Sequence, residues 1–447
     1  MRLNWFSPLL PERTDIAHYT ARLAPALMHR FDVVFWTDLH ADAQALPAGA
    51  KIQIFDAMRI EERESNRQLL RGLNVYNFGN DARFHAGIFQ VANRIPGLAI
   101  LHDTRLHGFV FELYRHAEPP WAGYLDLARE LYGKGGEARA RLIVACEGRI
   151  IEESAEDMPF VEAMVDNAIA AVCHTKPAGA DIRARSDVPI LTLTLPFRSL
   201  SERPNVRREW GPPWRFVMFG YLNSNRRLES IIRALSGLRD QLDFRLDIFG
   251  TLWDQPLIEA LIAQNGLSSS VTMHGFVPEK NLDEAIASAH LAFNLRYPTM
   301  GEASGGILRN WVHATPALVT NVGWYADLPD QVALKVSIEN EIADIRRSVL
   351  MLAERPRYFE KMGMAARDWL SQRHSPDAYA EEFAEALTDL APLMTRYAGR
   401  RMLQRVAAAS RSTAIRRVML DRAVEMISPL FKRNENAKAK RLGHLEN

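Results

Sequence analysis

Short runs of β-branched and aromatic residues alternate with amphipathic stretches of helical period up to Ile338. Strands that alternate with helices build parallel sheets from βαβ units. The pattern therefore predicts an α/β protein with two doubly wound, Rossmann-like halves, followed by helix to the end of the chain. The predicted strands are Leu3–Phe6, Val33–Trp36, Ile52–Phe55, Val75–Phe78, Leu98–Leu101, Ala170–Cys173 and Ile190–Leu195 in the first half, and Phe216–Phe219, Arg245–Phe249, Val271–Met273, Leu291–Leu295, Ala317–Thr320 and Leu334–Val336 in the second.

A segment rich in proline, arginine and glutamate separates the two halves. It covers Ser199–Trp214 and ends in Gly211-Pro212-Pro213, a composition typical of a linker. We therefore predict a first domain over 1–198, a linker over 199–214 and a second domain over 215–376. Doubly wound sheets bind ligands at the carboxyl ends of their strands, so the candidate site is the cleft between the domains. This architecture alone fits dehydrogenases, sugar epimerases, phosphorylases and glycosyltransferases equally.

Composition excludes few classes of protein. Hydrophobic residues make up 47% and charged residues 24% of the 447 positions, as in ordinary globular proteins. No apolar run approaches the roughly 20 residues that a membrane-spanning helix needs, and Pro8 breaks the N-terminal run where a signal peptide would continue. The two cysteines, Cys146 and Cys173, form neither a disulfide framework nor a zinc motif. We expect a cytoplasmic protein.

The net charge of +1 conceals an uneven distribution. From Arg396 to the end the chain carries 13 Lys and Arg against 4 Asp and Glu, which leaves a tail of +9 on a body of −8. A basic tail favours an anionic partner, such as a membrane surface or nucleic acid. The alternative is a solvated helix that packs on the acidic body.

The first candidate binding segment follows the strand Phe216–Phe219. The strand ends at Gly220, a polar loop follows, and Arg226 and Arg227 open an amphipathic helix. Glycine allows the backbone to approach a ligand, and a cation near a helix start suits a phosphate. The alternative is an ordinary strand-loop-helix turn with solvated arginines.

The second candidate segment joins a hydrophobic strand to a helix through a glycine-containing loop. Ser304, Gly305 and Gly306 would present backbone N–H groups at the helix start, where a diphosphate is stabilised by the helix dipole and by direct donors. In the same loop, Arg296 adds a cation, and Glu302 is placed to accept hydrogen bonds from sugar hydroxyls. We interpret this loop as part of a donor-binding site.

With these segments the chain resembles the retaining GT-B glycosyltransferases of family 4. In that family a strand-glycine-loop-arginine segment binds the donor phosphates, which the resemblance assigns to Arg226. A second loop touches the base and corresponds to Phe276-Val277, while Glu302 lies close to the first glutamate of the family's paired-glutamate motif. Thr315–Trp324 and Arg373–Pro376 match as well. The resemblance covers about residues 1 to 390 and implies that residues 377–395 form a helix that crosses back to the first domain.

The sequence departs from the family at the second motif glutamate. Counted back from Thr315-Pro316, that position holds Arg309, and Gly301 stands where the first glutamate would be. This part of the chain resembles a subgroup of the family that carries the pattern Arg-Tyr-Pro-Thr-x-Gly-Glu-x-Ser-Gly. The departure leaves open how a donor ribose is held, and Arg309 either reaches a phosphate or lies on the helix surface.

The first half resembles the same subgroup at its strand ends. His102 and Asp103 follow the strand Leu98–Leu101 and are expected to face the cleft, where a near-neutral imidazole can hydrogen-bond the donor sugar and Asp103 can orient it or contact the acceptor. The alternative for each histidine is a buried, hydrogen-bonded structural residue. The resemblance also places three residues on the acceptor side of the cleft: Asn80, His85 and His107.

These expectations define a metal-independent hexosyltransferase without a cofactor. It would move a hexose, with mannose favoured by the subgroup, from a nucleoside-diphosphate sugar to a glycan or lipid-linked acceptor in surface polysaccharide synthesis, with retention. The Asp-x-Asp metal motif of the other main glycosyltransferase architecture is absent at the strand ends. The alternatives are a catalytically inactive sugar-nucleotide-binding or scaffold protein, an epimerase, or a phosphorylase, which the few lysines in the cleft segments disfavour.

The last segment, residues 396–447, is predicted to be a basic helical tail. Its apolar positions are interleaved with arginines, which suits peripheral contact with the anionic inner face of a membrane, near a lipid-linked acceptor. A partner helix or a solvated extension fits the spacing equally. No nucleic-acid partner is expected.

Overall fold

The computed structural model describes residues 1–39, 42, 45–59, 72–200, 204 and 208–409. Within these ranges the first domain contains a seven-stranded sheet in the order β3-β2-β1-β4-β5-β6-β7, with every neighbouring pair parallel. The chain order reverses between β1 and β4, which places a crevice at the carboxyl ends of these two strands. The strands are β1 (Arg2–Phe6), β2 (Asp32–Thr37), β3 (Lys51–Ile54), β4 (Leu73–Phe78), β5 (Gly97–Leu101), β6 (Ala168–Cys173) and β7 (Ile190–Thr192).

The second domain contains a six-stranded sheet within the same described part of the chain. Its order is β10-β9-β8-β11-β12-β13, again with all pairs parallel, and the chain order reverses between β8 and β11. Most of the runs that predicted the strands lie inside the observed ones, whereas Ile52–Phe55, Ile190–Leu195 and Leu291–Leu295 extend one to three residues beyond them. The two parallel sheets confirm the predicted α/β class with two Rossmann-like domains. The strands are β8 (Trp214–Leu222), β9 (Phe244–Leu252), β10 (Val271–Gly275), β11 (Leu291–Asn294), β12 (Ala317–Thr320) and β13 (Leu334–Val336).

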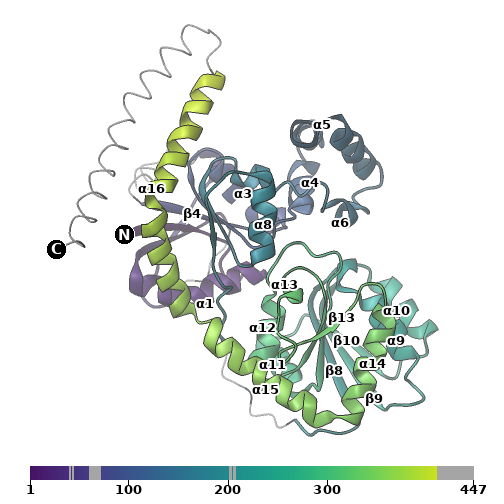
Figure 1. The fold of residues 1–447 in the computed structure, drawn as a ribbon. Helices are drawn as coiled ribbons and strands as arrows, with labels where there is room; N and C mark the ends of the chain where they lie inside the picture. Colours follow the sequence, from purple (N-terminus) through teal and green to yellow (C-terminus); the bar gives the residue numbers. More distant parts are fainter. Residues whose placement is uncertain (40–41, 43–44, 60–71, 201–203, 205–207, 410–447) are drawn as a thin grey trace, which may run out of the picture.

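Helices cover both faces of each sheet (Figure 1). The first helix begins where Thr14 caps its N-terminus, and the apolar face of that helix packs into the core of the first domain. The helices and 3₁₀ turns that build the two domains are α1 (Asp15–Arg30), η2 (Ala57–Arg59), α3 (Ala82–Ala92), α8 (Lys176–Arg185), η3 (Ser224–Arg226), α9 (Leu228–Ser236), α10 (Gln255–Gln264), α11 (Glu279–Ser288), α12 (Gly305–Val312), α13 (Gly323–Ala326), α14 (Glu341–Glu354) and α15 (Pro356–Arg373).

A helical insertion between β5 and β6 has no counterpart in the sequence analysis. It protrudes from the first domain on the side away from α16 (Figure 1) and surrounds a core of aromatic rings that includes Phe109, Tyr124 and Phe160. The longest of its helices is kinked at Gly133, whose φ of +69° interrupts the helical period. The insertion consists of α4 (His107–Arg115), α5 (Ala122–Ala145), α6 (Ile151–Ser154) and α7 (Val161–Val165).

The last described helix, α16 (Pro376–Ala409), leaves the second domain and runs along the first (Figure 1). It packs against α1, where the Tyr19 hydroxyl donates to the Tyr379 hydroxyl at 3.0 Å. No helix of the described residues is long and apolar enough to cross a membrane. Most of the predicted basic tail, and with it the expected membrane contact, lies outside the described residues.

Candidate active site

A cavity of about 740 Å³ lies between the two domains. The N-terminal part of α1 and the loop before it form one wall, and the ends of β8, β9 and β11 with the starts of α11 and α12 form the other. Its volume falls within the range of small-molecule sites. The cavity brings together seven of the residues predicted to bind a donor: Gly220, Arg226, Phe276, Val277, Arg296, Gly305 and Gly306.

Two glycines shape the floor of the cavity. Gly220 and Gly250 are register partners at the ends of β8 and β9, with φ values of +113° and +109°. A Cβ on Gly250 would lie 2.0 Å from the carbonyl oxygen of Gly220, so β9 can pack this closely against β8 only if residue 250 has no side chain. At Gly220 a Cβ would meet only the Arg226 guanidinium group, at 3.9 Å, so glycine there allows the positive φ and leaves the space above it open.

Arg226 follows this floor in the 3₁₀ turn η3. Its guanidinium group lines the cavity and makes no ion pair or side-chain hydrogen bond with any described residue. Burial, reinforced by the nearby Arg296, lowers the pKa of Arg226 to about 10, so the group remains charged at neutral pH. The neighbouring Arg227 differs, because it forms an ion pair with Glu341 at 2.8 Å. Arg226 is therefore a buried cation available to an anionic ligand.

The N-terminus of α12 faces the same space. The Ser304 side chain caps the helix by accepting a hydrogen bond from the Ile307 amide at 3.3 Å, so Ser304 is a structural cap. The amides of Gly305 and Gly306 belong to the first turn, which has no intrahelical acceptors. A Cβ on Gly305 would meet open space. The amides and dipole of α12 therefore complement the charge of Arg226.

Glu302 is held by protein donors and does not line the cavity. One carboxylate oxygen forms an ion pair with Arg296 at 2.8 Å, and the other accepts from the Thr299 hydroxyl at 3.0 Å and the Met300 amide at 2.7 Å. Burial is the largest influence and opposes ionisation, but Arg296, the hydrogen bonds to the carboxylate and Arg226 together outweigh it and lower the pKa of Glu302. The expected hydrogen bonds to sugar hydroxyls would have to displace these partners, so in this arrangement Glu302 holds the loop and orients Arg296.

Arg309, the residue at the second motif position, lines the cavity but is neutralised by carboxylates of α11. Its guanidinium group lies 2.8 Å from both Asp283 and Glu279. The sequence left open whether Arg309 reaches a phosphate or lies on the helix surface. A phosphate would have to compete with these two carboxylates for the guanidinium group. The structure instead gives Arg309 a role in fixing the start of α11 against α12.

His102 and Asp103 directly follow β5, as predicted, and are partly buried, but neither residue lines the cavity. His102 Nε2 is 3.1 Å from the Asn77 side-chain oxygen, and burial together with His174 lowers the pKa of His102 well below its ordinary value. Asp103 accepts from the Asn80 amide at 3.0 Å. Burial, reinforced by Glu302, raises the pKa of Asp103 to about 7. The pair therefore combines a neutral imidazole with a carboxyl group that titrates near neutrality.

We expect Asp103→Asn to stabilise the protein at pH 8 more than at pH 5. A carboxyl whose folded pKa is raised from 3.8 to about 7 favours folding when protonated, and this contribution is lost as the pH rises through 7. The shift corresponds to at most roughly 4 kcal/mol, reduced by partial exposure. Thermal unfolding at both pH values measures the difference, with Asp240→Asn, an 88% exposed position, as control. An equal change at both pH values would contradict the raised pKa.

The three residues expected on the acceptor side lie outside the cavity lining. The Asn80 side chain accepts from the Phe109 amide at 2.7 Å and so caps α4. His85 is buried with Nδ1 3.0 Å from the Asn77 carbonyl, and burial lowers its pKa to about 4. His107 is fully buried, with Nε2 2.7 Å from the Tyr124 hydroxyl and a pKa that burial lowers to about 4. Their contacts are those of structural residues.

The contribution of α1 to the cavity was not predicted from the sequence. His18 and Arg22 are one helical turn apart and both line it, opposite α11 and α12. Their spacing on an amphipathic helix was visible in the sequence. What the sequence does not show is that this face of α1 turns toward the other domain.

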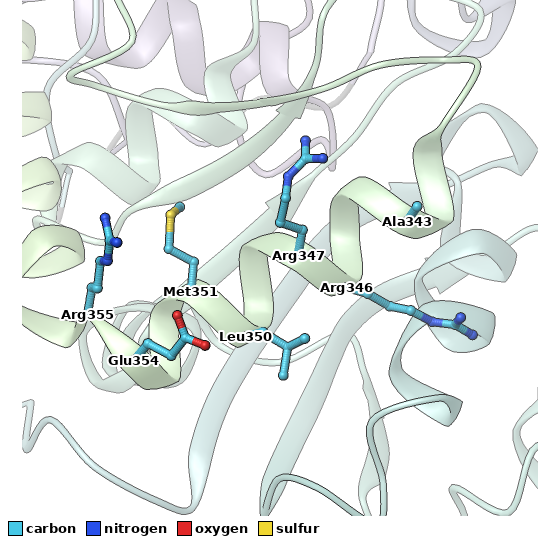
Figure 2. A pocket seen from close by; sticks show the side chains of 7 residues that line it. All are labelled: Ala343, Arg346, Arg347, Leu350, Met351, Glu354 and Arg355. Atoms are coloured by element: carbon cyan, nitrogen blue, oxygen red, sulfur yellow. The ribbon is translucent and has the colours of Figure 1, made fainter.

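A second hollow lies on the outer face of α14 (Figure 2). Two of its arginines contact nearby groups: Arg347 pairs with Asp344 at 2.8 Å, and Arg346 donates to the Ala234 carbonyl at 3.1 Å. The other two charged residues that line it, Glu354 and Arg355, are exposed, so this hollow offers no buried, unpaired cation comparable to Arg226. The described residues also contain no group of three or more His, Cys, Asp or Glu side chains placed to hold a metal ion.

Solved structures with the GT-B architecture are similar to the chain. A sucrose-phosphate synthase from Thermosynechococcus elongatus matches with a TM-score of 0.59 and 13% identity, over 87% of this chain and 99% of that one. HepE (Alr3699) from Anabaena, solved with UDP and glucose, gives 0.58 at 13% identity. WaaG, a glycosyltransferase involved in lipopolysaccharide biosynthesis, gives 0.57 at 14%; both matches cover 87% of this chain and 100% of theirs.

No protein-family model and no curated protein matches the sequence. At identities of 13 to 14%, the structural likeness establishes the fold. It confirms the predicted GT-B class: two Rossmann-like domains that face a cleft, with a helical C-terminal region.

Proposed function

We propose that this protein is a glycosyltransferase that uses a nucleoside-diphosphate sugar. One observation carries the proposal: the unpaired Arg226 guanidinium and the free amides at the start of α12 line the same interdomain cavity. A buried arginine and a helix N-terminus together suit a diphosphate, which each would bind through charge-assisted hydrogen bonds. The similar HepE structures contain UDP and UDP-glucose, which supports a ligand of this class.

The same groups suit the chemistry of sugar transfer. When the bond between the anomeric carbon and the phosphate oxygen breaks, negative charge grows on the leaving diphosphate while the sugar becomes oxocarbenium-like. Arg226 and the α12 amides are already in place to stabilise that charge, so little reorganisation is needed as the bond breaks. Closure of the two domains around the cavity would exclude water, which otherwise competes with the acceptor.

The acceptor hydroxyl must lose a proton as it bonds to the anomeric carbon. We propose a retaining, front-face transfer, in which an oxygen of the departing phosphate takes this proton and no protein nucleophile takes part. His102, held neutral by burial, would hydrogen-bond the donor sugar, and Asp103 would orient it or contact the acceptor. No step of this scheme calls for a metal ion or another cofactor.

The finer assignment rests on the family resemblance. We propose that the sugar is a hexose, with mannose favoured, and that the acceptor is a glycan or lipid-linked glycan of a surface polysaccharide. WaaG, which has the same architecture, takes part in lipopolysaccharide biosynthesis. The proposed site of action is the cytoplasm, at the inner face of the membrane if the basic tail binds anionic lipid.

The proposal is tested with a panel of UDP-, GDP- and ADP-hexoses. Release of a nucleoside diphosphate is measured with and without added glycan or lipid-linked acceptors. We expect release from at least one donor, with acceleration by a suitable acceptor. Binding of a nucleotide sugar without any turnover would instead identify a sugar-nucleotide-binding protein. The contacts of Glu302 with Arg296 and the Met300 amide favour this alternative, because they occupy the carboxylate that was expected to bind the sugar. If no donor binds, the proposed function is wrong.

A further inference from the structure

The α1 pair, defined as His18 and Arg22, forms a second polar group in the interdomain cavity, apart from Arg226. Arg22 is 9% exposed, and its guanidinium group has no hydrogen bond or ion pair with any described residue. The group stacks on the Phe197 ring, with its central carbon 4.1 Å from the ring centroid. His18, one turn earlier, likewise lacks a side-chain hydrogen bond within the described ranges, and its Nδ1 is buried. Buried donors without partners are costly, and a ligand would satisfy them.

The position of the α1 pair relative to α12 indicates which part of a ligand it meets. Arg22 and His18 lie close enough to Arg309 and Glu279 to interact with them electrostatically. Arg309 is four residues after Gly305 on α12, which is about 6 Å along the helix axis and on the same face. Because His18, Arg22, Gly305 and Arg309 all line the one cavity, we place the nucleoside attached to a diphosphate at Gly305 on the side of Arg309, toward the α1 pair.

The cavity near the α1 pair is suited to a flat heterocycle. Phe197, Leu282 and Val277 supply apolar walls, while Arg22 supplies only hydrogen-bond donors. Guanine presents the O6 and N7 acceptors and uracil presents the O4 acceptor, whereas adenine and cytosine place an exocyclic amine, a donor, at the corresponding edge. An arginine that faces such an amine would leave two donors unsatisfied. Arg22 therefore favours a base with a carbonyl group at that edge.

We propose that α1 of the first domain supplies the base-selecting contact of the donor site. Arg22 donates to the carbonyl edge of a uracil or guanine base, and His18 adds a hydrogen bond to the same nucleoside. This inference rests on the proposed function, because it assumes a diphosphate at Arg226 and α12. It identifies the donor as a uridine or guanosine diphosphate sugar and has the first domain contact the nucleotide held by the second.

The test is calorimetric titration of the full-length protein with UDP, GDP, ADP and CDP. We expect UDP or GDP to bind at least about tenfold more tightly than ADP and CDP, the discrimination of one good arginine–base contact. Arg22→Met should weaken binding of the favoured nucleotide by roughly tenfold to a hundredfold and change ADP binding little. His18→Asn should weaken the favoured nucleotide less. Arg30→Met, at the exposed end of the same helix, is the control and should match the wild type.

The outcomes separate this inference from the proposed function. Equal affinity of the wild type for all four nucleotides, or an equal loss for all four in Arg22→Met, would overturn the base contact and leave the diphosphate site intact. Failure of every nucleotide to bind would overturn the proposed function itself and the base contact with it. If Arg22→Met does not fold, the base contact is tested by the ranking of the four nucleotide affinities in the wild type and in Arg22→Lys. The lysine keeps the charge but loses the planar pair of donors, so Arg22→Lys should reduce the preference for UDP or GDP.

Discussion

Arg226→Ala is expected to weaken nucleoside-diphosphate binding and to lower the rate of donor turnover by roughly a hundredfold to a thousandfold, the usual effect of removing one preorganised donor to a developing anion. The same change should leave the melting temperature unchanged or slightly raised, because the guanidinium group has no partner among the described residues and its burial is unfavourable. Titration calorimetry, the donor-release assay and thermal unfolding measure the three quantities.

The adjacent arginine offers a matched control for this prediction. Arg227 forms an ion pair with Glu341, whose side chain is only 6% exposed, and it does not line the cavity. Arg227→Ala should therefore destabilise the second domain by about 2 kcal/mol, less than a fully buried pair would, while donor affinity stays near that of the wild type. If the two variants lost donor binding equally, the assignment of the diphosphate to Arg226 would fail.

Gly250→Ala is expected to destabilise the second domain by roughly 3 kcal/mol or more. The added Cβ would lie 2.0 Å from the Gly220 carbonyl oxygen, and φ at this position is +109°, so overpacking against backbone and an unfavourable conformation act together. Because Gly220 forms the cavity floor, donor binding should decline as well. The measurement is chemical denaturation followed by tryptophan fluorescence.

Gly275→Ala is the control for this change. Gly275 also has a positive φ, +63°, but a Cβ there would meet nothing within 4 Å. The Gly275→Ala variant should lose only about 1 kcal/mol of its free energy of unfolding, the cost of a positive φ at a residue with a side chain. Similar losses in both variants would show that the close packing of the β8 and β9 ends contributes little.

The sequence was sufficient to predict the two sheets because most strands are apolar runs bounded by polar turns. The central strands are buried, whereas the edge strand β3 is largely exposed. The helical insertion escaped prediction because its long helix is kinked at Gly133 and its core depends on aromatic contacts between segments far apart in the chain, such as Phe109 with Phe89. Strand periodicity carries no information about such packing.

The candidate site was predictable to the extent that its residues follow strand ends. Gly220 lies near the end of β8, Arg226 follows that strand and Gly305 opens α12, and all three line one cavity. Two features could not be predicted from motifs. The pairing of Glu302 with Arg296 depends on the conformation of their loop, and the presence of Arg22 in the cavity depends on how the domains face each other.

The most direct test of this account is a crystal structure of the protein with a bound nucleoside diphosphate. We expect the two phosphate groups between the Arg226 guanidinium and the amides of Gly305 and Gly306, within hydrogen-bond distance of both. Phosphate density elsewhere in the cleft, with Arg226 unpaired as before, would contradict the account.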